Sequence, residues 1–299
     1  MGNPLNSCYD IRNHFADVVN DSLRCFSAAL LRVSPALLLD WKRSRVDPLA
    51  CFQEAVPCMD VDSFLLERGR LYVIGDIHGR SDLLDRMIAA ICADLAANPV
   101  EECLTVTLGD YIDRGPDSRG VLDRLIKNPF PTKFLALKGN HELMFETFLR
   151  DPTVADQWRK FGGLETLTSY GVPVGSMMLG RNYEQAAQAL KAAVPQEHLE
   201  FISNLRTSAS VGDYFLCHAG VRPGVPLEAQ STEDLLWIRG PFLESRADFG
   251  KIVVHGHTPA EKPEVLPNRI NVDTGAYMTN RLTCGVLGRG AVRFLSTAT

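Results

Sequence analysis

The chain alternates short apolar runs with polar, glycine-bearing segments, and five of the apolar runs share one form. Each holds three or four mainly apolar or β-branched residues and ends close to a polar group such as Gly-Asp, Gly-Asn or Cys-His. This form is typical of a buried parallel strand whose carboxyl end opens into a loop, where binding sites gather. We therefore expect strands over residues 71–74, 105–108, 134–137, 214–216 and 252–254, with their polar ends at one edge of the fold.

The stretches between these runs show a different period. Apolar residues recur at helical spacing over residues 81–97, and strands that alternate with helices indicate a βαβ architecture. Residues 151–206 predict a helical insertion that is broken at Phe161-Gly162-Gly163. Because the insertion carries no cluster of metal-binding side chains, we expect it to form a cap or a groove wall. Further strands are expected over residues 270–273, 282–287 and 291–295, with a turn at residues 288–290.

The pattern divides the chain into two parts. Residues 1–70 show only weak helical periodicity and predict an N-terminal extension to which no function can be assigned. Residues 71–299 hold all the expected strands and the helical insertion, so they predict the domain that carries the function.

Composition narrows the class of protein. With 299 residues, of which 45% are hydrophobic and 22% charged, the chain can bury a substantial core. A net charge of −5 without a basic run argues against a nucleic-acid partner. The eight cysteines include no CxxC pair, so we expect reduced thiols. The sequence shows no signal-peptide pattern and no apolar run long enough to span a bilayer, so we expect a cytoplasmic protein without a membrane partner.

Polar residues with metal-binding side chains gather at the ends of the five expected strands. The clusters read GDIHG (75–79), GDYIDRG (109–115), GNHE (139–142), CHAG (217–220) and GHT (256–258). They contain four of the seven histidines, His78, His141, His218 and His257. Imidazole, carboxylate and amide oxygen are ligands that manganese, iron and zinc accept. The clusters together predict a hydrolytic metal site.

Taken singly, the same residues have ordinary structural interpretations. An aspartate such as Asp76 often caps a following helix, and Asp110 or Asp113 suits a glycine-flanked turn. Arg114 beside them suits an ordinary ion pair. Five such clusters at five strand ends are not explained by capping and turns, and this coincidence favours the metal site.

Several other conspicuous side chains are expected to be structural. His255 is interpreted as a buried, hydrogen-bonded histidine, and His14 and His198 as surface residues. Packing is the expected role of three aromatic residues, Trp158, Phe161 and Trp237.

In their order along the chain, the five clusters resemble the signature of the phosphoprotein phosphatase family of metallophosphoesterases. The resemblance is to bacterial and phage-type serine/threonine phosphatases, and it covers residues 71–295 or so. It implies an α/β fold, the calcineurin-like metallophosphoesterase sandwich of two mixed β-sheets with helices outside.

The resemblance also implies a set of metal ligands. The first of two divalent metal ions would be held by Asp76, His78 and Asp110. The second would be held by Asp110, Asn140, His218 and His257, so that Asp110 bridges the pair. Manganese is the expected metal, with iron and zinc as alternatives, because these ligands suit all three ions.

A mechanism follows from the same resemblance. A hydroxide that bridges the two metals would attack phosphorus in line, and His141, oriented by Asp113, would protonate the leaving group. Arg114 matches the family's phosphate-binding arginine, since guanidinium suits phosphate geometry. For a second phosphate-binding arginine we expect Arg239 first and Arg222 second.

Three functions remain open at this point. The first is a protein phosphatase acting on phosphoserine and phosphothreonine, with phosphotyrosine as a further substrate, whose partners would be phosphoproteins or phosphopeptides. The second is a symmetrical diadenosine tetraphosphatase, and the third a catalytically inactive scaffold. The motifs GDYIDRG and GNHE resemble those of protein phosphatases, which favours the first. No regulatory subunit can be inferred.

Overall fold

The computed structural model describes residues 59–60, 69–288 and 291–298. The extension expected over residues 1–70 falls almost wholly outside these residues, as do His14 and part of the expected turn at 288–290. None of the described helices is long and apolar enough to cross a membrane.

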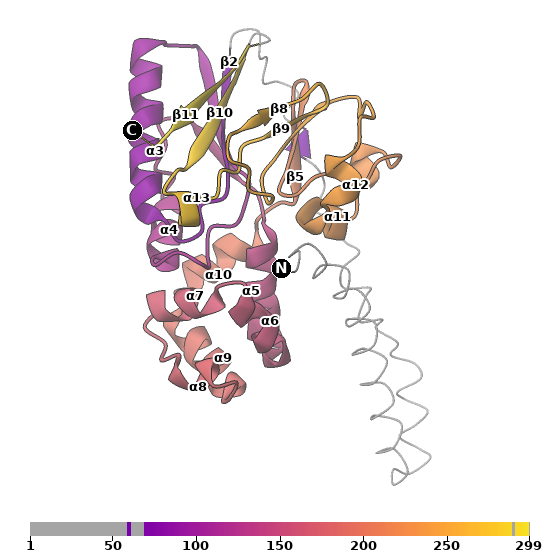
Figure 1. The fold of residues 1–299 in the computed structure, drawn as a ribbon. Coiled ribbons are helices and arrows are strands. Elements are labelled where there is room, and N and C mark those ends of the chain that lie inside the picture. The colour runs from indigo at the N-terminus through magenta and orange to yellow at the C-terminus, as the bar shows by residue number, and fades with distance from the viewer. Residues whose placement is uncertain (1–58, 61–68, 289–290, 299) are drawn as a thin grey trace, which may run out of the picture. The chain divides into compact units, whose positions relative to one another are not determined.

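Two mixed β-sheets form the centre of the molecule (Figure 1). The five-stranded sheet has the order β11 (Ala291–Ser296), β10 (Thr283–Gly288), β2 (Gly69–Ile74), β3 (Glu102–Thr107), β4 (Lys133–Ala136). The six-stranded sheet has the order β1 (Met59–Asp60), β5 (Ser208–Val211), β6 (Tyr214–Cys217), β7 (Ile252–His255), β9 (Arg269–Asn271), β8 (Glu264–Val265). Strands β2, β3 and β4 run parallel to one another, as do β6, β7 and β9.

Side-chain alternation along β2 shows how the layers pack. Leu71 and Val73 join a buried cluster that also contains Leu216 of β6, so this cluster lies between the two sheets. Tyr72 and Ile74 point to the other face and join a cluster with the helices. Because successive side chains of a strand alternate between faces, one apolar strand fills two cores.

Helices cover the outer faces of the sheets, and a helical segment extends below them in the view of Figure 1. The helices of the five-stranded sheet are α3 (Ser81–Ala97) and α4 (Ser118–Leu125). The extending segment begins with α5 (Asn140–Arg150) and continues through η4 (Pro152–Val154), α6 (Ala155–Lys160), α7 (Gly163–Ser169), α8 (Gly175–Met178), α9 (Tyr183–Ala193) and α10 (Gln196–Ser203). The remaining helices are η5 (Leu227–Ala229), α11 (Thr232–Trp237), α12 (Gly240–Leu243) and α13 (Ala276–Thr279).

The expected fold class is confirmed: two mixed sheets are flanked by helices. The five expected strands all occur, but they belong to two sheets, so their polar ends meet between the sheets rather than along one of them. The expected strand over residues 270–273 ends earlier, at Asn271. It ends there because the Asn271 side chain accepts the Asp273 N–H at 2.9 Å, which turns the chain out of the ladder.

Candidate active site

The candidate site is built from loops that follow the strands, and its backbone conformation is unusual. Among the described residues, five that the sequence singled out have a positive φ: His78 (46°), Asp110 (52°), Asp113 (70°), Arg114 (67°) and His257 (65°). Non-glycine residues adopt this region rarely and at a cost in energy, and such residues gather at functional sites. The loops are therefore held in place by tertiary contacts.

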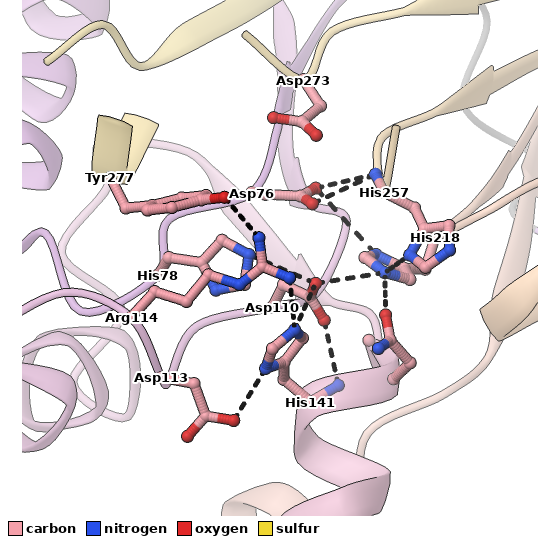
Figure 2. A network of polar contacts seen from close by, with 12 residues as sticks. Asp76, His78, Asp110, Asp113, Arg114, His141, His218, His257, Asp273 and Tyr277 are labelled. Atoms are coloured by element: carbon pink, nitrogen blue, oxygen red, sulfur yellow. Dashed lines mark hydrogen bonds and ion pairs between the residues drawn. The ribbon is translucent and has the colours of Figure 1, made fainter. Parts of the chain in front are cut away.

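Asp110 lies at the centre of the site (Figure 2). Its Oδ2 atom is 3.5 Å from His78 Nε2, 3.4 Å from His218 Nε2 and 3.8 Å from His141 Nε2. The side chain approaches so closely that a Cβ on Gly139 would lie 2.1 Å from Asp110 Oδ1. Glycine at position 139 is thus required by the placement of this carboxylate.

The hydrogen bonds of His78 and His218 fix which ring nitrogen carries a free lone pair. His78 Nδ1 lies 2.9 Å from Ile112 O, and His218 Nδ1 lies 3.1 Å from Leu108 O. A carbonyl oxygen only accepts, so both Nδ1 atoms donate. In the neutral imidazole the Nε2 atoms then present lone pairs to the Asp110 carboxylate.

His218 Nε2 faces two further ligand-type atoms. It is 2.8 Å from Asn140 Oδ1 and 3.1 Å from His257 Nδ1. Burial opposes protonation of His218, yet Asp110 and Asp76 raise the pKa of its imidazole to about 9. The donor set of nitrogen and oxygen lone pairs fits a divalent metal ion.

The six predicted metal ligands are all buried and lie close together, but they are not equally disposed. The ligand atoms of Asp110, His218 and His257 lie within 4.8 Å of one another, and so do those of Asp110, His78 and His141. The carboxylate of Asp76 instead accepts the His257 N–H, at 3.1 and 3.2 Å. His141, predicted as the acid, thus lies closer to His78 and Asp110, the expected ligands of the first metal, than the sequence indicated.

The pocket holds more carboxylates than its neighbours neutralise. Burial and then the charge of Asp273 raise the pKa of Asp76 well above its usual range. Burial raises the pKa of Asp273 to about 6, and its Oδ2 atom has no partner among the described residues. Burial opposes ionisation of Asp110 too, but His218 and His141 hold the pKa of that carboxyl well below its usual range. A bound cation would compensate this excess of buried negative charge.

His141 and Asp113 form a buried pair beside the pocket. Asp113 Oδ2 accepts a hydrogen bond from His141 Nδ1 at 2.7 Å, which directs His141 Nε2 toward Asp110 and Arg114. Burial opposes protonation of His141, but the carboxylates of Asp110 and Asp113 raise the pKa of the imidazole above its ordinary value. The Arg114 guanidinium lies 3.4 Å from His141 Nε2, donates to the Tyr277 hydroxyl at 2.7 Å and stacks on the Tyr277 ring.

The sequence did not reveal what holds Asp113. Trp158 Nε1 donates to Asp113 Oδ2 at 2.9 Å, and Thr166 Oγ1 donates to Asp113 Oδ1 at 2.5 Å. Both residues belong to the helical insertion, and Trp158 also packs as expected, against Phe148 and Phe145. Neither residue belongs to one of the five clusters. The only sequence signal near them is the Gly162-Gly163 break, which lies between the two.

A second missed contact joins two of the loops. Glu142 accepts the N–H groups of Asp110, Tyr111 and Gly139, at 2.9, 2.8 and 2.9 Å. In the sequence Glu142 was noticed only as part of the GNHE motif, although its place three residues after Gly139 is that of a capping residue. Burial, and then Asp110, raises the pKa of Glu142 to about 7.

The two candidate arginines differ in their surroundings. Arg239 is exposed, donates to Thr258 Oγ1 at 3.3 Å and lowers the pKa of nearby His257, after burial and His218. The guanidinium of Arg222 is held by both oxygens of Asp234, at 2.8 and 2.5 Å. Arg239 therefore has the freer guanidinium.

Two histidines outside the clusters are also accounted for. His255 is buried with Nδ1 3.0 Å from Gly256 O, as expected, and burial lowers the pKa of its imidazole to about 3. The prediction that His198 lies at the surface is wrong, because its side chain is fully buried. It lies 2.7 Å from the Tyr170 hydroxyl and 3.1 Å from Asp123, and these polar partners allow an imidazole inside the protein.

Comparisons with known proteins find a matching family model and several similar proteins. The family model for calcineurin-like phosphoesterases matches residues 69–282. Serine/threonine-protein phosphatase 1 of Salmonella typhimurium is 30% identical over 220 residues, which are 71% of this chain and 89% of the relative. An asymmetrical bis(5'-nucleosyl)-tetraphosphatase of Anoxybacillus flavithermus is 27% identical over 233 residues, 71% of this chain and 87% of the relative. A solved cold-active protein-tyrosine phosphatase of a Shewanella species has a TM-score of 0.50 at 17% identity, covering 75% of this chain and 77% of its own.

Proposed function

The chain belongs to the calcineurin-like phosphoesterase family, and from that premise we propose that it hydrolyses phosphomonoesters on proteins. Its substrates would be phosphoserine and phosphothreonine side chains, with phosphotyrosine as a further substrate. The general activity, that of a metallophosphoesterase hydrolase, follows from the family. The choice of substrate depends on the details of the site.

The observation that carries the proposal is the His141–Asp113 pair. Hydrolysis of a phosphomonoester expels an alkoxide or phenoxide, which needs a proton in the transition state. A polyphosphate leaving group is already a stable anion and needs a proton much less. A buried imidazole, held at Nδ1 by a carboxylate 2.7 Å away and with Nε2 directed toward Arg114 and Asp110, suits the first kind of leaving group.

Arginine side chains support the same substrate. Arg114 lies beside His141 Nε2 and can reach phosphoryl oxygens next to the leaving group. Arg239 lies near His257 and Thr258, with its guanidinium exposed. Two guanidinium groups, one near His141 and one near His257, would orient the phosphoryl group.

We further propose that two divalent cations occupy the pocket, manganese first, with iron and zinc as alternatives. The ligands would be Asp76, His78, Asp110, Asn140, His218 and His257. When bound, such ions supply a hydroxide at neutral pH and offset the charge of the phosphoryl oxygens. Elemental analysis of protein purified without chelators should find about two equivalents of metal; protein that keeps less than one equivalent under all three metals would contradict the proposal.

The second candidate function is hydrolysis of dinucleoside tetraphosphates. It is favoured by the relative named as an asymmetrical bis(5'-nucleosyl)-tetraphosphatase, which covers as much of this chain as the phosphatase does. The asymmetrical reaction class differs from the symmetrical one that the sequence led us to consider. Both reactions use the same kind of pocket, so only turnover can separate them.

Phosphate release from matched phosphopeptides, compared with diadenosine tetraphosphate cleavage, tests the proposal. With added manganese, kcat/KM for the peptides should exceed that for the dinucleotide, and His141→Ala should slow the peptides more because its proton matters more there. Faster cleavage of the dinucleotide would overturn the proposal. Absence of turnover with either substrate, in protein shown to contain metal, would point to the inactive scaffold.

A further inference from the structure

Two half-buried aromatic side chains contact residues of the candidate site, and we call Phe161 and Trp237 the aromatic wall. Their ring centroids are 6.3 Å apart with the planes tilted by 52°. Phe161 meets the ring of His141 edge to face at 6.1 Å, and Trp237 meets His257 edge to face at 6.3 Å. The wall thus extends from the candidate acid to a candidate metal ligand.

Phe161 is held in place by the loop of the site itself. It follows the last residue of α6, and the next residue, Gly162, accepts the Arg114 N–H at 3.1 Å. Gly162 has φ 96°, and a Cβ there would lie 2.5 Å from Arg114 N. Only glycine allows this close backbone contact, so Phe161 is fixed relative to Arg114 and His141.

Trp237 reaches the same place from the other sheet. It is the last residue of α11, which packs with the six-stranded sheet, and it stands two residues before Arg239. The two halves of the wall therefore come from elements that are distant in the sequence and meet beside His141 and His257. Neither residue supplies a metal-binding atom, so a substitution in the wall leaves the ligand set intact.

The wall lies where the leaving group must be. His141 Nδ1 is occupied by Asp113, so proton donation takes place from Nε2, and the leaving oxygen must come within hydrogen-bond reach of that atom. Because Phe161 packs against the same imidazole, the group attached to that oxygen lies beside the wall. This step rests on the proposed function, since it uses His141 as the acid.

The chemistry of the wall selects among leaving groups. A phenyl ring bonded directly to the phosphate oxygen can pack on Phe161 and Trp237, and aromatic pairs are stabilised beyond the area they bury. A serine side chain offers one methylene group at the same place. A polyphosphate chain would bring charge against an apolar surface, which costs solvation.

We propose that Phe161 and Trp237 are specificity-determining residues that favour aryl phosphomonoesters, phosphotyrosine among protein substrates, over alkyl ones. The preference acts through contact with the leaving group after the phosphoryl group is bound. Aryl esters are also intrinsically more reactive than alkyl esters. The preference is therefore measured as the change, from wild type to variant, in the ratio of kcat/KM for an aryl substrate to that for an alkyl substrate.

Two peptides that differ only in phosphotyrosine against phosphoserine provide the measurement. For Phe161→Leu and Trp237→Leu, kcat/KM for the phosphotyrosine peptide should fall about 5- to 10-fold, while that for the phosphoserine peptide stays within about 2-fold. Phe161→Tyr should restore the wild-type ratio, since it keeps the ring. Phe134→Leu is the matched control: Phe134 is half-buried on β4, packs on Phe130 at 5.1 Å, and should leave the ratio unchanged.

The outcomes separate this inference from the proposed function. If both peptides lose activity equally in the Phe161 and Trp237 variants, or if neither does, the wall does not read the leaving group, while the proposed function stands. If wild-type protein hydrolyses neither peptide, the proposed function fails and the inference with it. Equal melting temperatures of the variants and the Phe134→Leu control would show that the ratio reports contact rather than folding.

Discussion

The strand-end loops and the helical insertion both border the site, but they contribute different things. The loops supply the groups with chemistry: carboxylates, imidazoles and an amide around Asp110. The insertion supplies no such group, yet Trp158 and Thr166 hold Asp113, and Gly162 holds Arg114. The comparison teaches that one region provides reactive groups and the other their orientation.

Asp113 and the strand ends also differ in how completely their polar atoms are satisfied. Both oxygens of Asp113 accept hydrogen bonds, from His141, Trp158 and Thr166. At the strand ends, Asp273 Oδ2 and His257 Nε2 are buried without a partner among the described residues. Since unsatisfied buried groups are costly, bound cations would stabilise the strand-end region, whereas the Asp113 carboxylate is already satisfied by protein donors.

Asp110→Asn removes the central carboxylate of the strand-end region and should give the largest effect on activity. An amide cannot provide the shared negative charge that lies 3.4–3.5 Å from His78 and His218, so both metal positions weaken. We expect kcat/KM to fall by more than about 10³, which places the loss in or above the upper half of the range for a lost proton donor. Metal content measured alongside turnover should fall too; full metal content with full activity would contradict the central place of Asp110.

Asp113→Asn should disturb the contact between the two regions, because Asp113 joins His141 to Trp158 and Thr166. The amide removes a carboxylate that raises the pKa of His141, so that pKa falls. A general acid works only below its pKa; the alkaline limb of the kcat profile should therefore move to lower pH, with a loss of about 10²-fold at neutral pH. Metal content should stay at the wild-type level, unlike that of Asp110→Asn. An unmoved alkaline limb would show that the pair does not donate the proton.

The sequence predicted the strand-end region well because its information is local. Each cluster places its ligands within a few residues of an apolar run, so strand and site are read together, as at Gly109-Asp110 after β3. The parallel strands and the fold class could be predicted in this way. The main correction is that the strand ends belong to two sheets and not to the edge of a single sheet. Confinement of the site to the ends of buried strands is a general rule, which makes this inference transferable.

The insertion was predicted only in outline because its contacts are long-range. Trp158 is 45 residues from Asp113 and Thr166 is 53, and nothing near either residue in the chain indicates the partner. His198 was misassigned for the same reason: its partners Tyr170 and Asp123 lie on other elements. A polar residue is expected at the surface unless its partner is known, and tertiary structure alone reveals that partner.

Trp158→Phe sharpens the comparison from the insertion side. Phenylalanine keeps much of the packing against Phe148 but removes the N–H bonded to Asp113. Supporting residues of this kind typically change activity by about 10- to 100-fold, and we expect the lower end because Thr166 still holds the carboxylate. Turnover and its pH profile provide the measurement.

The control for Trp158→Phe removes a hydrogen bond of the insertion that does not reach the site. Tyr170→Phe deletes the hydroxyl bonded to His198, which is buried in the same segment. It should lower stability by about 1 kcal/mol without changing kcat. If Tyr170→Phe slowed turnover as much as Trp158→Phe, general loosening of the insertion, and not the bond to Asp113, would be the cause.

His198→Phe should give the smallest effect on activity. It tests whether a buried histidine with an aspartate partner contributes to catalysis when it lies away from the candidate site. His198 lies 3.1 Å from Asp123 as His141 lies 2.7 Å from Asp113, but its hydrogen-bond partners, Tyr170 and Asp123, are not among the six predicted metal ligands. The substitution leaves the Tyr170 hydroxyl buried without this partner, which should cost about 1–3 kcal/mol in the free energy of unfolding, with kcat within about twofold. Combining it with Tyr170→Phe removes both partners and should recover part of the loss, because two matched apolar groups are tolerated better than one orphaned hydroxyl. Denaturant unfolding of the two single variants and the double variant measures this coupling. Strictly additive losses would mean that the bond between Tyr170, which follows α7, and His198 of α10 contributes nothing, and that the insertion is anchored by its apolar core alone.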